Sequence, residues 1–303
     1  MSFERVAIIG LGLLGGSIGL AVDEALPDVA TTGFDADPAV RRRAAERGLA
    51  GTICETAQEA VADADLVILC VPVGAMGEVA REIAPALKPG SLVSDVGSTK
   101  ASIAAALGKA LPGHAVIPAH PVAGTEHSGP DAGFASLFHH RWCILTPPAD
   151  ADPAQVDALA AFWRALGSMV EIMDAQHHDL VLAVTSHIPH LIAYTIVGTA
   201  SDLEDVTQGE VIKYSAGGFR DFTRIAASDP TMWRDVFLNN RDAVLEVLGR
   251  FSEDLTALQR AIRSGDGDTL FDRFTKTRAI RRSIIEQGQD DARPDFGRKD
   301  HDD

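Results

Sequence analysis

The amino-acid sequence predicts an α/β domain built on a doubly wound, mostly parallel sheet, followed by an all-helical domain. In the first part of the chain, short apolar runs alternate with amphipathic helical stretches, which is the pattern of parallel strands joined by crossover helices. After about Asp174 the strand pattern stops and only helical periodicity continues. We therefore expect an α/β domain over residues 1–173 and a helical domain over residues 174–289. Residues 290–303 are charged and carry no apolar anchors, so they are expected to form a disordered tail.

Each expected element follows from the pattern of its apolar side chains. Short apolar runs predict strands at residues 6–10, 31–35, 66–71, 92–95, 115–119, 142–146 and 169–173. Helical periodicity between them predicts helices at residues 15–25, 38–47, 74–87, 100–111 and 153–166. In the second domain the same periodicity predicts helices at residues 175–200, 205–215, 230–263 and 268–287. Pro189 is expected to kink the first of these.

The composition excludes several classes of protein. The formal net charge of −16 over 303 residues argues against a surface for nucleic acid or anionic membrane, because such surfaces need clustered positive charge. The N-terminus has no basic segment leading into a long apolar one, and the longest apolar runs fall short of the ~20 residues that a membrane span needs. Cys54, Cys70 and Cys143 are widely spaced and odd in number, as expected of reduced thiols. We therefore expect a cytoplasmic protein.

A glycine-rich motif predicts a dinucleotide site. Gly10, Gly12 and Gly15 form G-x-G-x-x-G between the first expected strand and helix, where a tight turn lets the helix N-terminus face phosphates. Asp35 ends the second strand about 20 residues further on, where its carboxylate can bind ribose hydroxyls and would repel a 2′-phosphate. Asp37, rather than Asp35, is expected to cap the next helix. The cofactor is therefore expected to be NAD, held by Gly10, Gly12, Leu13, Leu14, Gly15, Asp35, Val71 and Pro72.

Polar motifs at the carboxyl ends of neighbouring strands predict the reacting groups. DVGSTK supplies Ser98 and AHPVAGTEHSG supplies His120, and ligands of a doubly wound sheet bind at this edge. Histidine suits acid–base chemistry near neutral pH because its ordinary pKa is about 6.5. Thr125 and Glu126 lie on the same loop as His120. Position alone leaves open a second interpretation, in which His120 is a buried, hydrogen-bonded structural residue.

Five motifs together resemble one enzyme family. GLGLLGGSIG, DVGSTK, HPVAGTEHSG, SHIPH and GGFRDFTRIAASDPTMWRDVFLNN, in that order, are similar to the prephenate dehydrogenase family, which includes arogenate and cyclohexadienyl dehydrogenases of tyrosine biosynthesis. The resemblance extends from about Arg5 to Gln289. It implies NAD-dependent oxidative decarboxylation of prephenate to 4-hydroxyphenylpyruvate. It also implies a Rossmann-type N-terminal domain and a helical C-terminal domain that forms a homodimer.

The resemblance also implies roles for individual residues. His120 matches the family's catalytic histidine, which takes the proton of the substrate ring hydroxyl as hydride leaves, and Ser98 matches the serine that orients both groups. Arg224 matches the arginine that binds a substrate carboxylate. The remaining matches are to substrate-pocket positions, namely Thr125, Glu126, Ser186, His190 and Gly217. No metal site is expected, because the spacings of the histidines match no standard pattern.

The other histidines and cations have simpler interpretations. His187 is expected to be structural. Surface positions are expected for four further histidines, His139, His140, His177 and His178. The basic residues near the Arg224 motif could be solvated or paired with aspartates, and they are Lys213, Arg220 and Arg234. Arg220 could equally help to bind a dianionic substrate.

Three alternatives remain at this level. Within the family, the substrate could be arogenate, or the enzyme could accept both compounds. A β-hydroxyacid dehydrogenase would share the domain plan, but such enzymes rely on a lysine-centred helix motif for which the sequence offers no convincing match. A non-enzymatic NAD-binding module would not need the combination of Ser98, His120, His190 and Arg224.

Overall fold

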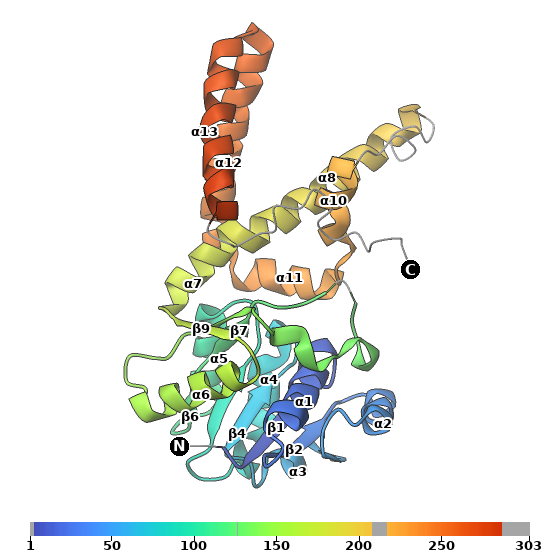
Figure 1. Cartoon of the computed structure of the whole chain (residues 1–303), viewed down its shortest axis with the longest axis vertical. Helices are drawn as coiled ribbons and strands as arrows, with labels where there is room; N and C mark the ends of the chain where they lie inside the picture. The colour runs from blue at the N-terminus through green and yellow to red at the C-terminus, as the bar shows by residue number, and fades with distance from the viewer. Residues whose placement is uncertain (1–2, 126, 208–216, 287–303) are drawn as a thin grey trace. The chain divides into compact units, whose positions relative to one another are not determined.

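A computed structural model of the chain describes residues 3–125, 127–207 and 217–286 (Figure 1). By its internal contacts the chain divides into two compact units, Met1–Leu245 and Glu246–Asp303. The first unit holds both sheets and all the helices through α11, so the unit boundary lies inside the helix α12 (Arg241–Ser264). The expected division of the chain at residue 173 falls within this first unit and remains a prediction.

The first unit is organised around a six-stranded parallel sheet with strand order β3-β2-β1-β4-β5-β6. The strands are β1 (Arg5–Ile9), β2 (Ala30–Phe34), β3 (Thr52–Ile53), β4 (Leu66–Leu69), β5 (Leu92–Asp95) and β6 (Ala115–Val116). The helices that connect them are α1 (Leu13–Ala25), α2 (Pro38–Arg47), α3 (Ala57–Val61), α4 (Met76–Ile83) and α5 (Ala101–Ala110). The strand order reverses between β1 and β4, and ligands of such sheets bind at the carboxyl ends of the strands beside this reversal. The predicted doubly wound α/β fold is therefore confirmed, although sequence patterns missed the short elements β3 and α3.

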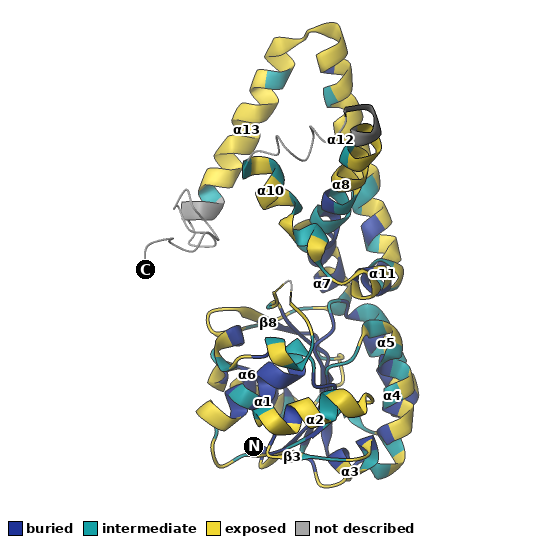
Figure 2. Cartoon of the chain, turned by 90° about the vertical axis from the view of Figure 1, so that its right-hand side faces the viewer, coloured by how far each residue is buried: buried dark blue, intermediate teal, exposed yellow. Residues whose placement is uncertain are grey.

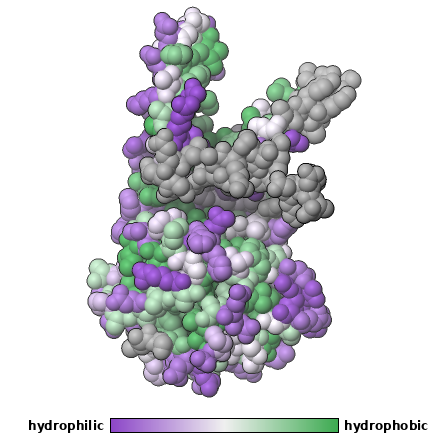
Figure 3. All heavy atoms as spheres, in the orientation of Figure 1, coloured by the Kyte–Doolittle hydropathy of each residue, from purple (hydrophilic) through white to green (hydrophobic). Residues whose placement is uncertain are grey.

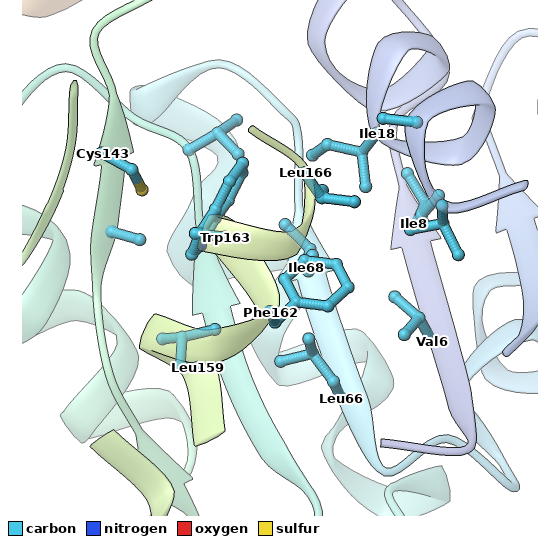
Figure 4. Close-up of a cluster of buried hydrophobic side chains, with 14 of the residues drawn as sticks. Val6, Ile8, Ile18, Leu66, Ile68, Cys143, Leu159, Phe162, Trp163 and Leu166 are labelled. Carbon is cyan, nitrogen blue, oxygen red and sulfur yellow. The ribbon is translucent and has the colours of Figure 1, made fainter. Parts of the chain in front are cut away.

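Alternate residues of each strand face opposite sides of this sheet, and both sides are buried. In β1, Val6 and Ile8 belong to one core cluster, whereas Ala7 and Ile9 belong to the other. Figure 4 shows the first cluster, which combines Phe162 and Trp163 of α6 (Pro153–Ala165) with side chains of β1 and β4. Helices α3, α4 and α5 supply the second cluster. Burial on both faces explains why the central strand β4 is apolar throughout, as in other parallel sheets.

A second, three-stranded sheet begins where a single strand was expected at residues 115–119. That expectation is wrong, because β6 ends at Val116 and a new strand, β7 (Ala119–Pro121), pairs antiparallel with β8 (Trp142–Leu145). The third strand of this sheet is β9 (Met169–Ile172). Pro118 lies between β6 and β7, and it has no N–H with which to continue the first ladder. The chain therefore changes sheets immediately before His120.

The helices after β9 begin with one long, continuous helical segment. It consists of α7 (Ala175–Leu182), the π-helical turn η5 (Ala183–His187) and α8 (Ile188–Thr207). Pro189 cannot donate a backbone hydrogen bond, and the π turn η5 lies just before it. The kink expected at Pro189 remains a prediction. The part over Ala175–Leu203 is long and apolar enough to cross a membrane by length and composition. Only 28% of that apolar window is buried, and one such helix is weak evidence for a membrane span. At its start, the buried His178 and Asp179 bond to β7 and to the first N–H groups of α5.

The remaining helices of the first unit differ from the expected ones in two places. Residues 230–263 form α11 (Pro230–Asn239) and α12 rather than one helix, because the backbone breaks at Asn240 (φ −113°, ψ 32°). The GGFRDFT motif forms the short helix α10 (Gly217–Thr223), followed by the turn η6 (Arg224–Ala227). The helix expected at residues 205–215 lies outside the described residues from position 208 onward, and its first three residues end α8.

The second unit is a helical hairpin with an exposed apolar face. It contains the rest of α12 and the helix α13 (Gly267–Glu286). An ion pair joins the two helices, with a guanidinium nitrogen of Arg273 2.7 Å from a carboxylate oxygen of Asp254. Figure 2 shows these helices as almost entirely exposed, and apolar side chains are visible along them in Figure 3. The large exposed apolar residues of the hairpin are Phe251, Leu255, Ile262, Phe271, Phe274 and Ile280.

Candidate active site

The turn between β1 and α1 leaves an open space at the N-terminus of α1. Gly10 has φ +100°, and a Cβ there would collide with the Cys70 carbonyl, while a Cβ on Gly15 would collide with the Gly10 carbonyl. Gly12 differs, because a Cβ there would meet no atom within 4 Å. Gly12 is also the N-cap of α1, and no side chain caps the N-terminus of this helix. The first turn of α1 contains no acidic residue. Uncapped N–H groups facing open space fit a dinucleotide pyrophosphate.

Asp35 lies beside this turn with its carboxylate fixed in place. Its Oδ2 accepts from the Leu11 N–H at 2.8 Å, and its Oδ1 accepts from the Asp37 N–H at 3.0 Å. Asp37 caps α2 through a bond from the Ala39 N–H, as expected. The neighbouring cation, Arg41, donates to the Asp35 carbonyl and pairs with a glutamate, Glu55. The Asp35 carboxylate is therefore fixed beside the glycine turn by two backbone N–H groups.

The loops after β4 and β5 reach the same edge of the sheet. The Val71 side chain lies 3.3 Å from where a Cβ on Gly10 would be. Pro72 directly precedes the short helical turn that leads into α4. Ser98, three residues after β5, is half-buried. Cys70 leads into the first of these loops, and burial raises the pKa of its thiol. The structure thus brings the glycine turn, Val71 and Ser98 to one edge.

A buried ion pair fixes the residue before His120. Lys100 and Asp95 form a salt bridge with both side chains fully buried. Lys100 also donates to the Ala119 carbonyl at 2.7 Å, and Asp95 accepts from the Ala119 N–H at 3.2 Å. Burial lowers the pKa of Lys100 and raises the pKa of Asp95, while their mutual attraction opposes both changes. Because both backbone groups of Ala119 are held, the start of β7 has a fixed position relative to β5.

His120 is the first member of a chain of three buried side chains. Its Nδ1 lies 2.9 Å from Nε2 of His178, and Nδ1 of His178 lies 2.9 Å from Oδ1 of Asp179. The expected surface position of His178 is wrong, because its side chain is fully buried. Burial, followed by the nearby His178 and Lys100, lowers the pKa of His120 well below 6.5. Burial also lowers the pKa of His178, so both rings are neutral near neutral pH.

Asp179 joins this chain to the second histidine motif. Asn240, at the break between α11 and α12, donates to the Asp179 carbonyl at 2.8 Å and lies 3.0 Å from Nδ1 of His187. Burial lowers the pKa of His187 to about 4. Its Nε2 is buried and has no hydrogen-bond partner among the described residues. His187 therefore packs as a neutral structural residue within the cluster.

His190 completes the cluster on the next helical turn. Its Nδ1–H donates to the Ser186 carbonyl at 2.8 Å, so Nε2 is the acceptor nitrogen of the neutral ring. The ring stacks on Trp233 of α11, with centroids 3.7 Å apart and an interplanar angle of 24°. Burial lowers the pKa of His190, and the positive charge of Arg224 contributes to the lowering. His190, Trp233 and Arg224 therefore lie together, with the buried Trp233 indole N–H lacking a partner among described residues.

Some expected site residues lie apart from this cluster or outside the described residues. Thr125 is exposed, and its hydroxyl accepts from the His127 N–H at 3.2 Å. Gly217 begins α10 and is half-buried. Glu126 and Lys213 lie outside the described residues. No group of metal-ligating side chains was found among the residues described here.

Sequence patterns missed four residues of the cluster, which are His178, Asp179, Trp233 and Asn240. Two of them left a usable signal, because His178 and Asp179 lie eight residues before Ser186 and His187. That spacing is about two helical turns, so each pair shares a face of the long helix. Asn240 left no such signal, since its role depends on a break between two helices that the periodicity did not reveal.

Comparison with known proteins assigns the chain to a family. The family model for the prephenate dehydrogenase nucleotide-binding domain matches residues 18–172, and that for the prephenate dehydrogenase dimerization domain matches residues 174–276. The chain is 45% identical over 282 residues to a cyclohexadienyl dehydrogenase of Zymomonas mobilis, covering 93% of this chain and 96% of the relative. It is 31% identical to a prephenate dehydrogenase of Bacillus subtilis, covering 97% and 79% of the two chains.

A solved structure agrees with these matches. Prephenate dehydrogenase from Aquifex aeolicus, in complex with hydroxyphenyl propionate and NAD+, superimposes with a TM-score of 0.87 and 31% identity, covering 94% of this chain and 99% of that one. The glycine turn and Asp35 fit the same cofactor, NAD. The two family models span both the sheet that carries His120 and the helices that carry His178 and His190. The chain is therefore an NAD-binding dehydrogenase that belongs to the prephenate dehydrogenase family.

Proposed function

We propose that this protein converts prephenate to 4-hydroxyphenylpyruvate and carbon dioxide. Bound NAD supplies the hydride acceptor for this reaction. The observation that carries the proposal is the state of His120 at the carboxyl edge of the sheet. Its ring is held neutral by burial, its Nδ1 is engaged by His178, and none of the described residues hydrogen-bonds its Nε2. That nitrogen is therefore available to accept the proton of the ring hydroxyl as hydride and carbon dioxide leave.

The remaining roles are those that the family resemblance implies, and the chemistry of each side chain fits them. Ser98 orients the hydroxyl against His120, and Arg224 binds a carboxylate of the substrate through parallel hydrogen bonds. His190, with its acceptor nitrogen fixed by Ser186, offers a second polar contact in the same pocket. Thr125, Glu126, Ser186 and Gly217 are proposed to complete the pocket. Formation of an aromatic ring makes the product a thermodynamic sink, so the protein has mainly to align the reactants and polarise one hydroxyl.

The cofactor residues are proposed on the same basis. The backbone at Gly10, Gly12 and Gly15 would hold the pyrophosphate, and Asp35 would accept from the ribose hydroxyls. Three apolar residues are proposed to line the nicotinamide side and the turn, namely Leu13, Leu14 and Val71, with Pro72 beside them. Because Asp35 would repel a 2′-phosphate, NAD should be preferred over NADP.

The name of one relative favours a second candidate substrate. The 45% identical relative from Zymomonas mobilis is named a cyclohexadienyl dehydrogenase, which favours an enzyme that accepts arogenate as well as prephenate. The two compounds differ in the side chain, which carries an amino acid in arogenate and a pyruvyl group in prephenate. The carboxylate contact proposed for Arg224 would serve both.

The test is to follow NADH formation with prephenate and with arogenate, each with NAD and then NADP. We expect turnover of prephenate with NAD, and comparable turnover of arogenate would support dual specificity. Failure of both substrates with either cofactor would exclude the proposal, even if NAD binds. Turnover of arogenate alone would replace prephenate with arogenate as the substrate.

We further propose a homodimer in the cytoplasm, with the α12–α13 hairpin in the interface. The second family model is that of a dimerization domain, and the hairpin exposes large apolar side chains, among them Phe271 at 71% and Ile262 at 67%. A single chain rarely leaves such a surface uncovered. Sedimentation at micromolar concentration should give twice the 32.1 kDa of one chain. A species that stays monomeric would refute the dimer without affecting the proposed chemistry.

A further inference from the structure

We infer that His178 and Asp179 are positioning residues that fix the tautomer of His120 through a relay of hydrogen bonds. The inference rests on the proposed function, since it explains how His120 presents an unprotonated Nε2 to a substrate hydroxyl. The three side chains come from two segments, because His120 lies in β7 while His178 and Asp179 lie in α7. The relay runs from Asp179 through His178 to His120.

The carboxylate of Asp179 sets the direction of the relay because it can only accept. Its Oδ1 accepts from the Lys100 N–H at 2.7 Å, and its Oδ2 accepts from the Ala101 N–H at 2.9 Å. These N–H groups begin α5, and no side chain of its own N-cap residue satisfies them. Negative charge is stabilised at a helix N-terminus. With both oxygens facing donors, the nitrogen of His178 that faces Oδ1 must carry a hydrogen.

The proton positions on both rings then follow. A neutral imidazole has one N–H and one acceptor nitrogen. Since Nδ1 of His178 donates to Asp179, Nε2 of His178 is an acceptor. The atom opposite it, Nδ1 of His120, must therefore donate across the 2.9 Å contact, and Nε2 of His120 keeps its lone pair. Burial lowers the pKa of both His120 and His178, so the neutral forms persist near neutral pH.

The relay also prepares the cluster for the charge that forms during the reaction. When Nε2 of His120 takes the hydroxyl proton, the ring becomes a cation whose Nδ1–H still donates to His178. The other ionisable groups that face this ring are Lys100, His187 and, through the Ala119 backbone, Asp95. Lys100 disfavours the cation, His187 is neutral near neutral pH, and Asp95 is paired with Lys100. Asp179 is thus the anion aligned with the imidazole rings, two hydrogen bonds from the new charge.

Two substitutions at one position separate tautomer control from packing. His178→Gln places a side-chain oxygen near Nε2 of the original ring, so an acceptor for His120 remains. His178→Leu keeps an apolar side chain of similar bulk but removes the acceptor. His177→Leu is the matched control, because His177 is the adjacent residue and is exposed.

We expect His178→Leu to lower kcat about 10²–10³-fold with little change in the KM for prephenate, because an orienting residue acts on the chemical step. We expect His178→Gln to recover at least about tenfold of that loss and His177→Leu to match wild type. Equal activity of the Leu and Gln variants at this position would overturn the relay. A raised KM with unchanged kcat would do the same.

A second measurement does not depend on catalysis. Nitrogen-15 spectra of histidine-labelled protein with NAD bound would report which ring nitrogens of His120 and His178 carry hydrogen, assigned by comparing variants among the ten histidines. We expect Nδ1–H on both rings in the wild type, and loss of the fixed Nδ1–H tautomer of His120 in His178→Leu. An Nε2–H tautomer of His120 in the wild type would refute the inference even if His178→Leu fails to fold. If instead the tautomers are as expected and prephenate is not turned over, the proposed function fails while the relay stands.

Discussion

The glycine turn and the histidine cluster are built in opposite ways. The turn uses backbone from one short stretch, with Asp35 of the next strand completing it. The cluster uses side chains from β7, from the long helix and from the α11–α12 break, as the bonds of Asn240 to Asp179 and His187 illustrate. The first backbone N–H groups of a helix lack partners within the helix, so they can bind a ligand whatever side chains the turn carries. A buried side-chain network, by contrast, depends on every member, because an unpaired buried polar group costs about 1–3 kcal/mol.

This difference predicts the largest effect in the histidine cluster. His120→Asn should lower kcat by roughly 10²–10⁴-fold with little change in KM, as expected on losing a general base. In the wild type, kcat/KM should fall with decreasing pH only well below 6.5, because burial lowers the pKa of His120. Steady-state NADH formation across pH measures both. A fully active His120→Asn protein would refute the role of His120 as general base.

The next largest effect is expected at Arg224, which should serve binding more than chemistry. Prephenate is a dianion and the protein carries a net charge of −16, so a local cation must hold the substrate. Losing such a partner costs on the order of 2–5 kcal/mol, about 30- to several-thousand-fold in affinity. Arg224→Ala should raise KM accordingly while NAD binding stays intact. Arg224→Lys should recover only part, because ammonium cannot make two parallel bonds to a carboxylate.

Comparison with Arg220→Ala provides the control for this measurement. Arg220 lies in α10, one turn before Arg224, and both residues are exposed. If Arg224→Ala leaves KM near wild type and Arg220→Ala raises it, the carboxylate contact belongs to Arg220.

Acid should destabilise the histidine cluster without a comparable effect on the glycine turn. His187 has a folded-state pKa of about 4 against an ordinary value near 6.5. Below 6.5 the unfolded chain binds a proton that the folded cluster excludes, so stability falls with pH until about 4 is reached. The loss is on the order of 3 kcal/mol, and buried His120 and His178 act in the same direction. Urea unfolding at pH 7 and pH 5 should show a smaller loss for His187→Gln, whereas exposed His177→Gln should match wild type.

Two glycine substitutions should separate the folding role of the turn from its binding role. Gly15→Ala should destabilise the protein by about 1–3 kcal/mol, because its Cβ would strike the Gly10 carbonyl. Gly12→Ala should leave the melting temperature nearly unchanged, since nothing in the protein lies within 4 Å of its Cβ. It should still weaken NAD binding about tenfold, because the added methyl group enters the phosphate space. Thermal unfolding and NAD titration measure the two effects, and unchanged NAD affinity in Gly12→Ala would place the pyrophosphate elsewhere.

The smallest effect is expected at Asp35. Asp35→Ser should weaken NAD and improve NADP binding, each by roughly tenfold, since the substitution removes a charge that repels a 2′-phosphate. The carboxylate also holds the Leu11 and Asp37 N–H groups, so thermal unfolding is needed as a control. Equal use of both cofactors by the unmodified protein would contradict the assigned role.

Sequence patterns predicted most of the sheet and the glycine turn because both are local. The ranges of β5 and α2 agree with expectation to the residue. The prediction of one strand at residues 115–119 was wrong because that stretch contributes β6 to one sheet and β7 to the other. A run of apolar residues does not show which partner each strand takes. The helix expected at residues 230–263 failed at Asn240, whose side-chain bonds accompany a break that apolar periodicity does not reveal. Ser98, His120, His190 and Arg224 were proposed from motifs, and their roles await the tests above.

The sequence by itself determined the parallel fold, the NAD cofactor and the family, because short-range periodicity and contiguous motifs encode them. Only the tertiary structure decided that His178 is buried against His120, since the same residue on an isolated helix would be equally compatible with solvent. The physical reason is that a hydrogen bond between residues 58 positions apart exists only after β7 and α7 have packed. The same packing removes water from both rings, and that removal lowers their pKa and leaves them neutral. Tautomer and charge state, on which the chemistry depends, are therefore properties of the folded protein.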